Sequence, residues 1–339
     1  MLLMLRSAIA LALLTIPAVS GAQYKISHHF VVGGDGGWDY VVPDSTHHRL
    51  FIGRQDRVMV VEEMTGKLVG EVKGIHGAHG TAIDEATGHG FATSGDDSSI
   101  VMFDLKTFKH LARAHAAEDA DAIIFDPASH RVFSFNGDAH SATVVDPKTG
   151  KFVANIDLGG KPEYGVSAGS GMIYVNLTDK SEVVEVDGRS MTVTRRWSAS
   201  PCAQPVAMAI DRAHGRLFSG CRSGVMAVSD IAAGRVVATV PIGQGTDGAA
   251  FDPASGDAFA SNLDGTLTII HQDTPDTYRV VQTLPTAAGS RNMGFDPVTR
   301  KAYVVGARFG PAPEKATKDN PRRRPAILPG TFEVMVIER

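Results

Sequence analysis

One nine-residue phrase recurs along the chain with small changes. It reads FDPASHRVF at residues 125–133, FDPASGDAF at 251–259 and FDPVTRKAY at 295–303. Anchoring each copy on its final aromatic residue gives seven copies, with successive spacings of 40, 42, 41, 44, 41 and 44 residues. The anchors are Phe51, Phe91, Phe133, Tyr174, Phe218, Phe259 and Tyr303. A period of this length restricts the fold to architectures in which similar units stack on one another.

Each copy has the pattern of four short strands. The apolar run AIIF stops at Asp126-Pro127, because proline can neither donate a ladder hydrogen bond nor continue the strand. The Asp126 side chain can accept hydrogen bonds from backbone amides of the turn, so FDPASHRVF predicts a β-hairpin. A third strand is expected at 141–146 and a fourth at 151–159. Four strands in a unit of about 42 residues are typical of a β-propeller blade.

The seven copies predict an all-β, seven-bladed β-propeller with four antiparallel strands per blade. The last copy supplies only three strands, at NMGFD, KAYVVG and TFEVMVIER. The segment YKISHHFVVGG at 24–34 is similar in sequence to a predicted fourth strand elsewhere in the chain. We therefore expect the N-terminal strand to close the last blade, which would remove an open sheet edge.

The first 22 residues have the pattern of a secretory signal. Arg6 precedes an apolar run from Ala8 to Ile16, and the segment ends in Ser20-Gly21-Ala22. The expected organisation is a signal peptide at 1–22 and a propeller at 23–339. After cleavage we expect a periplasmic or secreted monomer with no membrane insertion.

The net charge limits the classes of partner to be expected, and the two cysteines raise the question of a disulfide. The formal net charge is −4, so an exported, mildly acidic chain gives no electrostatic reason to expect nucleic acid as a partner. Cys202 and Cys221 are the two cysteines. The inferred register, with residue 210 opposite 217, brings them to one edge of a blade about two residues out of line. The sequence is compatible with a structural disulfide between these cysteines and also with two separate thiols.

The sequence of the repeats resembles that of the YVTN-repeat β-propellers of bacteria and archaea. The resemblance is carried by IYVNLTDKSEVVEVD at 173–187, VVDPKTGKFVANIDLGGKPEYGVS at 144–167 and GRVVATVPIG at 234–243, and it extends over 24–339. It implies the propeller fold. The family has been linked to surface layers, nucleic acid and small ligands, and it has no fixed catalytic motif to carry over to this chain.

A ligand site is expected at one mouth of the central channel, where the inner strands begin. Residues five before each turn aspartate mark these starts: Asp39, His79, Asp121, Asp247 and Arg291, with Glu163 and Gln204 in the two irregular copies. Close by in sequence are Trp38, His76, Asp119, Tyr164 and Asn292. Turns after the second strands add Arg54, Asp96, Asp138 and Arg222, which read mostly as ordinary turn residues.

The acidic ring suggests a possible divalent cation, with His79, Asp121, Glu163 and Asp247 as candidate ligands. The alternative is that inner strands simply end in water and carry polar residues for that reason. No other cofactor is evident in the sequence.

The one departure from the repeat is the insertion GPAPEKATKDNPRRRPAILPG at 310–330. It contains the run Arg322, Arg323, Arg324 between prolines. Its position in the last copy places it on the channel-mouth face, where it would be an ordered lid, a partner-binding arm or a disordered loop.

Two functions remain after these observations. The first is a non-enzymatic binding or scaffold propeller that recognises a small polar ligand, a cation or a protein partner at the channel mouth. The second is a metal-dependent hydrolase or lyase of the lactonase type, in which the axial acids and His79 hold the metal. The sequence has no nucleophile elbow, no serine triad order and no cofactor fingerprint, which favours binding.

Overall fold

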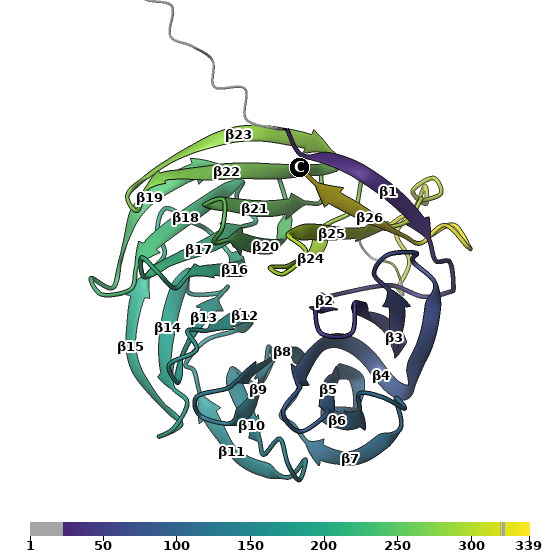
Figure 1. Cartoon of the computed structure of the whole chain (residues 1–339), viewed down its shortest axis with the longest axis horizontal. Helices are drawn as coiled ribbons and strands as arrows, with labels where there is room; N and C mark the ends of the chain where they lie inside the picture. Colours follow the sequence, from purple (N-terminus) through teal and green to yellow (C-terminus); the bar gives the residue numbers. More distant parts are fainter. Residues whose placement is uncertain (1–22, 319, 321–322) are drawn as a thin grey trace, which may run out of the picture.

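The computed structural model describes residues 23–318, 320 and 323–339. These residues form a ring of antiparallel sheets around a central axis (Figure 1). The β-propeller fold expected from the repeat is confirmed. The predicted signal segment 1–22 and Arg322 lie outside the described residues. No helix in the described part of the chain is long and apolar enough to cross a membrane.

Five sheets have four strands each. In chain order these sheets contain β8 (Ala120–Asp126), β9 (Arg131–Asn136), β10 (Ser141–Val145) and β11 (Phe152–Asp157); β12 (Pro162–Ser167), β13 (Met172–Leu177), β14 (Glu182–Asp187) and β15 (Thr192–Ser198); β16 (Pro205–Asp211), β17 (Arg216–Cys221), β18 (Val225–Asp230) and β19 (Arg235–Pro241); β20 (Thr246–Asp252), β21 (Asp257–Asn262), β22 (Thr266–Thr274) and β23 (Thr277–Pro285); and β24 (Asn292–Asp296), β25 (Lys301–Gly306), β26 (Glu333–Glu338) and β1 (Lys25–Val31).

The sixth sheet has six strands. It contains β2 (Val41–Asp44), β3 (Arg49–Glu62), β4 (Leu68–Asp84), β5 (His89–Ser94), β6 (Ser99–Asp104) and β7 (His110–His115), with the short 3-10 helix η1 (Gly95–Asp97) between β5 and β6.

The prediction of seven four-stranded blades is therefore wrong, because the described residues form six hydrogen-bonded sheets. The reason lies in β3 and β4, which span 14 and 17 residues and run through stretches that we expected to separate strands. β3 pairs with β2 through residues 49–52 and with β4 from Gln55 onward, with a register shift in that second pairing between Gln55 and Arg57. Gly74 and Gly77 have φ values of 71° and 67°, so β4 changes direction without ending. The first two copies of the repeat consequently share one sheet.

The expected closure of the ring also needs correction. β1 pairs antiparallel with β26, so it forms the outer edge of the last sheet. The joint between the last and the first sheet lies elsewhere, where β24 contacts β2 and the two sheet faces pack together. Val41, Ile52 and Met59 pack there against Tyr303 and Phe332 in one buried cluster. Side-chain packing between the first and the last sheet therefore closes the ring, and β1 completes the last sheet.

The repeat anchors form the core between sheets. All seven aromatic anchors are at most 3 % exposed. The turn aspartates act as predicted, since Asp252 Oδ1 accepts a hydrogen bond from the Ala254 amide at 2.9 Å and Asp296 Oδ1 accepts one from the Val298 amide at 2.8 Å. The repeated nine-residue motif thus encodes both a hairpin turn, through its aspartate, and a buried aromatic contact, through its final residue.

Cys202 and Cys221 are joined by a disulfide, with Cα atoms 5.6 Å apart. The predicted register is confirmed, because Ile210 lies opposite Leu217. A register shift between Pro205 and Ala207 places Pro205 opposite Cys221, and Cys202 reaches the disulfide from the segment just before β16.

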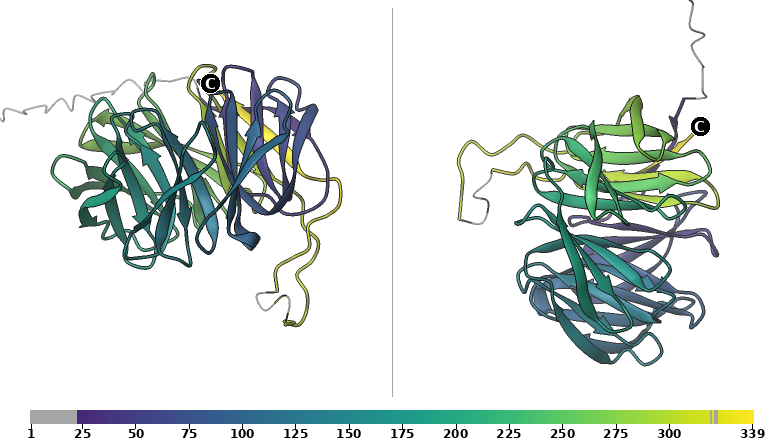
Figure 2. Two further views of the ribbon diagram at one scale, coloured as in Figure 1. Left: turned by 90° about the horizontal axis from the view of Figure 1, so that it is seen from below. Right: turned by 90° about the vertical axis from the view of Figure 1, so that its left-hand side faces the viewer.

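The insertion leaves one face of the ring and extends away from it (Figure 2). Its base is ordered, because Phe309 and Ile327 form an isolated antiparallel bridge. The Gly310 amide donates to the Ala326 carbonyl at 2.8 Å, and the Leu328 amide donates to the Arg308 carbonyl at 2.8 Å. We call residues 308–310 and 326–328 the insertion stem.

Candidate functional site

The predicted channel-mouth residues belong to the inner strands or directly precede them. Asp39 comes just before β2, His79 lies in β4, Asp121 in β8, Glu163 in β12, Asp247 in β20, and Arg291 just before β24. Gly53 lets β3 approach β4 closely, because a Cβ atom there would lie 2.2 Å from the His79 carbonyl oxygen. Thr93 donates a hydrogen bond to the Asp121 carbonyl at 2.6 Å, which fixes the start of β8.

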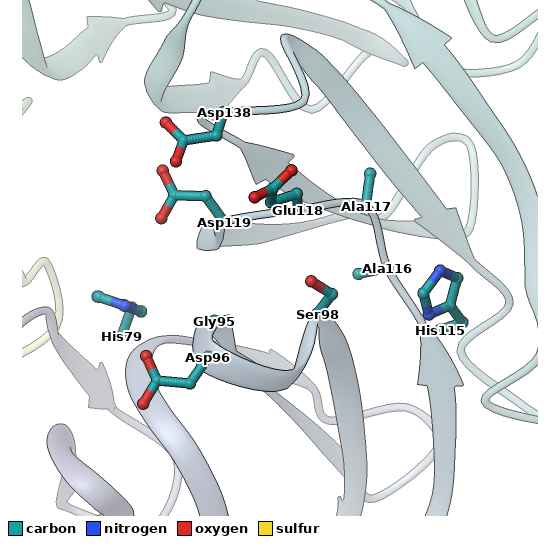
Figure 3. A pocket seen from close by; sticks show the side chains of 10 residues that line it. All are labelled: His79, Gly95, Asp96, Ser98, His115, Ala116, Ala117, Glu118, Asp119 and Asp138. Carbon is teal, nitrogen blue, oxygen red and sulfur yellow. The ribbon is translucent and has the colours of Figure 1, made fainter.

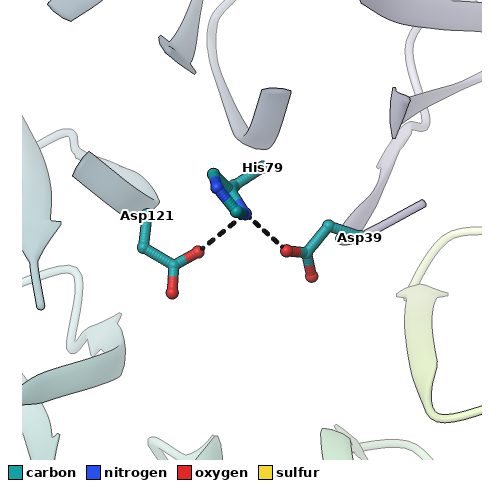
Figure 4. A group of neighbouring side chains, drawn as sticks. All are labelled: Asp39, His79 and Asp121. Carbon is teal, nitrogen blue, oxygen red and sulfur yellow. Dashed lines mark hydrogen bonds and ion pairs between the residues drawn. The ribbon is translucent and has the colours of Figure 1, made fainter. Parts of the chain in front are cut away.

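Three of these residues form what we call the axial triad: Asp39, His79 and Asp121. His79 Nδ1 lies 2.7 Å from Asp39 Oδ2 and 3.4 Å from Asp121 Oδ1, so the imidazole lies between the two carboxylates (Figure 4). Asn292 Nδ2 donates to the other Asp39 oxygen at 3.0 Å. One ligand atom from each triad residue lies within 4.8 Å of the others. The triad therefore has the spacing of a small cation site.

The triad holds more protons than the same groups would in water. Burial alone would lower the pKa of His79, but the hydrogen bond that its ring donates to Asp39 and the charge of Asp121 outweigh burial and raise that pKa to about 9. Burial, together with the charge of Asp39, raises the pKa of Asp121 well above its usual value, although the charge of His79 opposes this. At neutral pH the imidazole is therefore protonated and bridges two acids.

The other side of the mouth contains two acid–arginine pairs. Arg222 donates to Glu163 Oε1 at 2.9 Å, and Arg291 Nε donates to Asp247 Oδ2 at 2.6 Å. Burial raises the pKa of Glu163 to about 7, against the opposing charge of Arg222. Burial also raises the pKa of Asp247, against the charge of Arg291.

The four metal ligands predicted from the sequence do not lie together in one site. His79 and Asp121 lie together with Asp39, which the metal set omitted, while Glu163 and Asp247 face arginines. Among the described residues, the only other group of this spacing is Asp44, His47 and Glu85, and there Arg49 already pairs with Asp44 at 2.6 Å.

Two tyrosines lie beneath the charged residues. The rings of Tyr40 and Tyr164 are 5.2 Å apart. Burial and the nearby charge of Asp121 raise the pKa of Tyr40 well above its usual value, and burial raises that of Tyr164. Tyr164 also lines two cavities of about 500 and 390 Å³, whose other lining residues include the apolar Val42, Ala249 and Ile124.

An acidic pocket opens beside His79 (Figure 3). Its volume is about 530 Å³, and its lining includes Asp96, Glu118, Asp119 and Asp138. Lys161 lies next to it, with Nζ 2.6 Å from Asp138 and 3.4 Å from Asp119. The pocket therefore places further acidic side chains beside the axial triad.

The remaining predicted residues lie outside the triad. Trp38 packs against Phe309 and Phe332 at ring distances of 5.9 and 5.6 Å. His76 is exposed, and its backbone amide donates to Ser94 Oγ at 2.8 Å. Gln204 contributes its backbone carbonyl, which accepts from the Arg222 amide at 3.1 Å.

Sequence reasoning missed Tyr40 and Lys161 and undervalued Arg222. Tyr40 follows Asp39 directly, so its position at the head of an inner strand was an available signal. Arg222 reads as a turn residue, and its contact with Glu163 joins positions 59 apart in sequence. Only the curvature of the ring brings these two residues together.

No family model and no curated protein matches the sequence, so the resemblance to YVTN-repeat propellers is not established as membership. One solved structure that matches is a chain of hydrazine synthase from Kuenenia stuttgartiensis, with a TM-score of 0.68 and 15 % sequence identity. The match covers 79 % of this chain and 92 % of that chain. At this identity the likeness supports the β-propeller fold alone.

Proposed function

We propose that this protein is an exported, monomeric binding propeller that recognises a cation at its channel mouth. The observation that carries the proposal is the axial triad, in which Asp39 before β2, His79 in β4 and Asp121 in β8 place two carboxylates and one imidazole within 4.8 Å of one another. Such a donor set suits a transition-metal dication such as Zn²⁺. The disulfide between Cys202 and Cys221 supports the exported location.

The acidic pocket adds to this proposal. Asp96, Glu118, Asp119 and Asp138 surround the entrance next to His79 and would attract cations toward the triad. Lys161 neutralises part of this charge through Asp138 and Asp119, which leaves Asp96 and Glu118 as the other acids of the pocket.

Titration calorimetry with Zn²⁺ tests the proposal. The Asp121→Asn variant is expected to bind Zn²⁺ at least about tenfold more weakly than the wild type, because an amide oxygen replaces a charged ligand. Asp273→Asn is the matched control, since Asp273 is an exposed acid on β22 far from the triad in sequence, and its affinity should equal that of the wild type. Equal Zn²⁺ affinity for Asp121→Asn and the wild type would refute the site.

A second candidate function, hydrolysis of a small lactone or ester at the same mouth, is favoured by one observation. A carboxyl group with a pKa of about 7, as in Glu163, can exchange protons at neutral pH and act as a general base. We expect any such activity to rise through pH 7 and to fall at least about 100-fold in Glu163→Gln. A panel of aliphatic lactones assayed with the Zn²⁺-loaded protein checks this, and undiminished turnover by Glu163→Gln would exclude the role.

A further inference from the structure

A second cavity lies between the insertion stem and the ring, apart from the axial triad. Its volume is about 640 Å³. Its walls come from three places: Phe309 and Ile327 of the insertion stem, Trp38 before β2, and the segments around Leu263 and Gly289. We call it the stem pocket.

The walls of the stem pocket are held in place by specific contacts. The Gly289 amide donates to the Leu263 carbonyl at 2.9 Å. Gly289 has a φ of 88°, and a Cβ atom there would lie 2.5 Å from the Phe309 ring, so only glycine lets this ring pack so closely. Trp38 packs on the same ring at 5.9 Å. The pocket is therefore built by ordered parts of the chain.

The lining is unusually apolar for an exposed surface. Leu263 is 46 % exposed and Phe309 is 36 % exposed, and both line the pocket together with Trp38 and Ile327. Large apolar side chains that share an exposed concave surface mark a binding site more often than isolated ones do. A volume of about 640 Å³ lies in the range that accommodates a small organic molecule.

Two guanidinium groups border this apolar lining. Arg291 is already paired with Asp247 at 2.6 Å. Arg324 comes from the insertion, is exposed, and has no ion pair with another residue in the part of the chain that the structure describes. Arginine binds carboxylates through paired, charge-assisted hydrogen bonds. Arg324 lies at the edge of an apolar pocket, so a ligand that uses both features has an anionic group and an apolar body.

We propose that the stem pocket binds a small carboxylate with an aromatic or aliphatic body. The body packs between Trp38, Leu263 and Phe309, and the carboxylate pairs with Arg324. This ligand class is opposite in charge to the cation expected at the axial triad, so the two sites are chemically distinct. The insertion then serves as one wall of a binding site.

Trp38 offers a direct measurement, because the sequence has only one other tryptophan, Trp197. In a Trp197→Phe background, tryptophan emission reports on the stem pocket. We expect 3-phenylpropanoate to change this emission and to bind at least about tenfold more tightly than its neutral amide, 3-phenylpropanamide.

Two substitutions separate the charge from the apolar walls. Arg324→Gln should remove the preference for the acid over the amide and leave binding of the amide unchanged. Arg323→Gln is the matched control, since Arg323 donates to the Pro313 carbonyl at 2.8 Å and does not line the pocket. Leu263→Gln should weaken both probes. Equal binding of acid and amide to the unsubstituted pocket, or an acid preference that survives in Arg324→Gln, would overturn the proposal.

Discussion

Replacing Arg54 with methionine is expected to lower the free energy of unfolding by about 3–5 kcal/mol. Arg54 is fully buried, and its guanidinium donates hydrogen bonds to all five backbone carbonyls of residues 33–37 at 2.9 to 3.2 Å. It also stacks on Phe332, with Cζ 3.8 Å from the ring centroid. Methionine has similar length but no donors, so these carbonyls would lose their partner.

Urea unfolding of the purified variants measures this effect. Arg54→Lys should lose a smaller amount, because an ammonium group cannot reach five carbonyls at once. Arg235→Met is the control, since Arg235 is an exposed residue at the start of β19 and should change stability by no more than about 0.5 kcal/mol. A loss below about 1 kcal/mol for Arg54→Met would show that the 33–37 loop does not depend on this side chain.

The second large effect is a dependence of stability on pH that arises from His79. Its pKa is raised from 6.5 to about 9 in the folded protein, so protonated His79 stabilises the folded state fully below about pH 6.5. This stabilisation is lost as the pH rises through 9. The side chain is 30 % exposed, and the shift corresponds to about 3 kcal/mol.

The comparison of wild type with His79→Gln isolates this contribution. The free energy of unfolding of the wild type should fall relative to that of the variant between about pH 6.5 and 9.5. Raised pKa values at Asp121 and Glu163 act in the same direction at lower pH, because the folded state also binds their protons more tightly. Parallel curves for the two proteins over this range would mean that His79 is not held protonated by the acids.

Local sequence patterns predicted much of the fold. The buried aromatic anchors and the turn aspartates follow from the residues of single copies, as Phe133 and Asp252 illustrate. The number of sheets did not follow, because Gly74 and Gly77 are compatible with either a break or a continued strand. Hydrogen bonding between β3 and β4 decided between these two outcomes.

The sequence predicted which residues surround the channel mouth, but it did not predict which of their side chains contact one another. The start of each inner strand identified Asp39, His79 and Asp121 as neighbours of the axis. Which acid lies next to the imidazole depends on the angle between sheets, which no single repeat encodes. For the same reason the sequence did not show that Glu163 pairs with Arg222 and Asp247 with Arg291, apart from the axial triad.

The central claim is that the channel mouth holds a cation site whose histidine is protonated when no metal is bound. The most direct test is to measure proton release on Zn²⁺ binding. Titration calorimetry at pH 7 in PIPES and in HEPES, whose ionisation enthalpies differ, gives the number of protons released per bound ion. A metal ligand must be deprotonated, and the pKa of His79 is about 9, so the wild type should release at least about one proton per Zn²⁺ and His79→Gln should not bind at this site. Zn²⁺ binding without proton release, or with equal affinity in His79→Gln, would contradict the account.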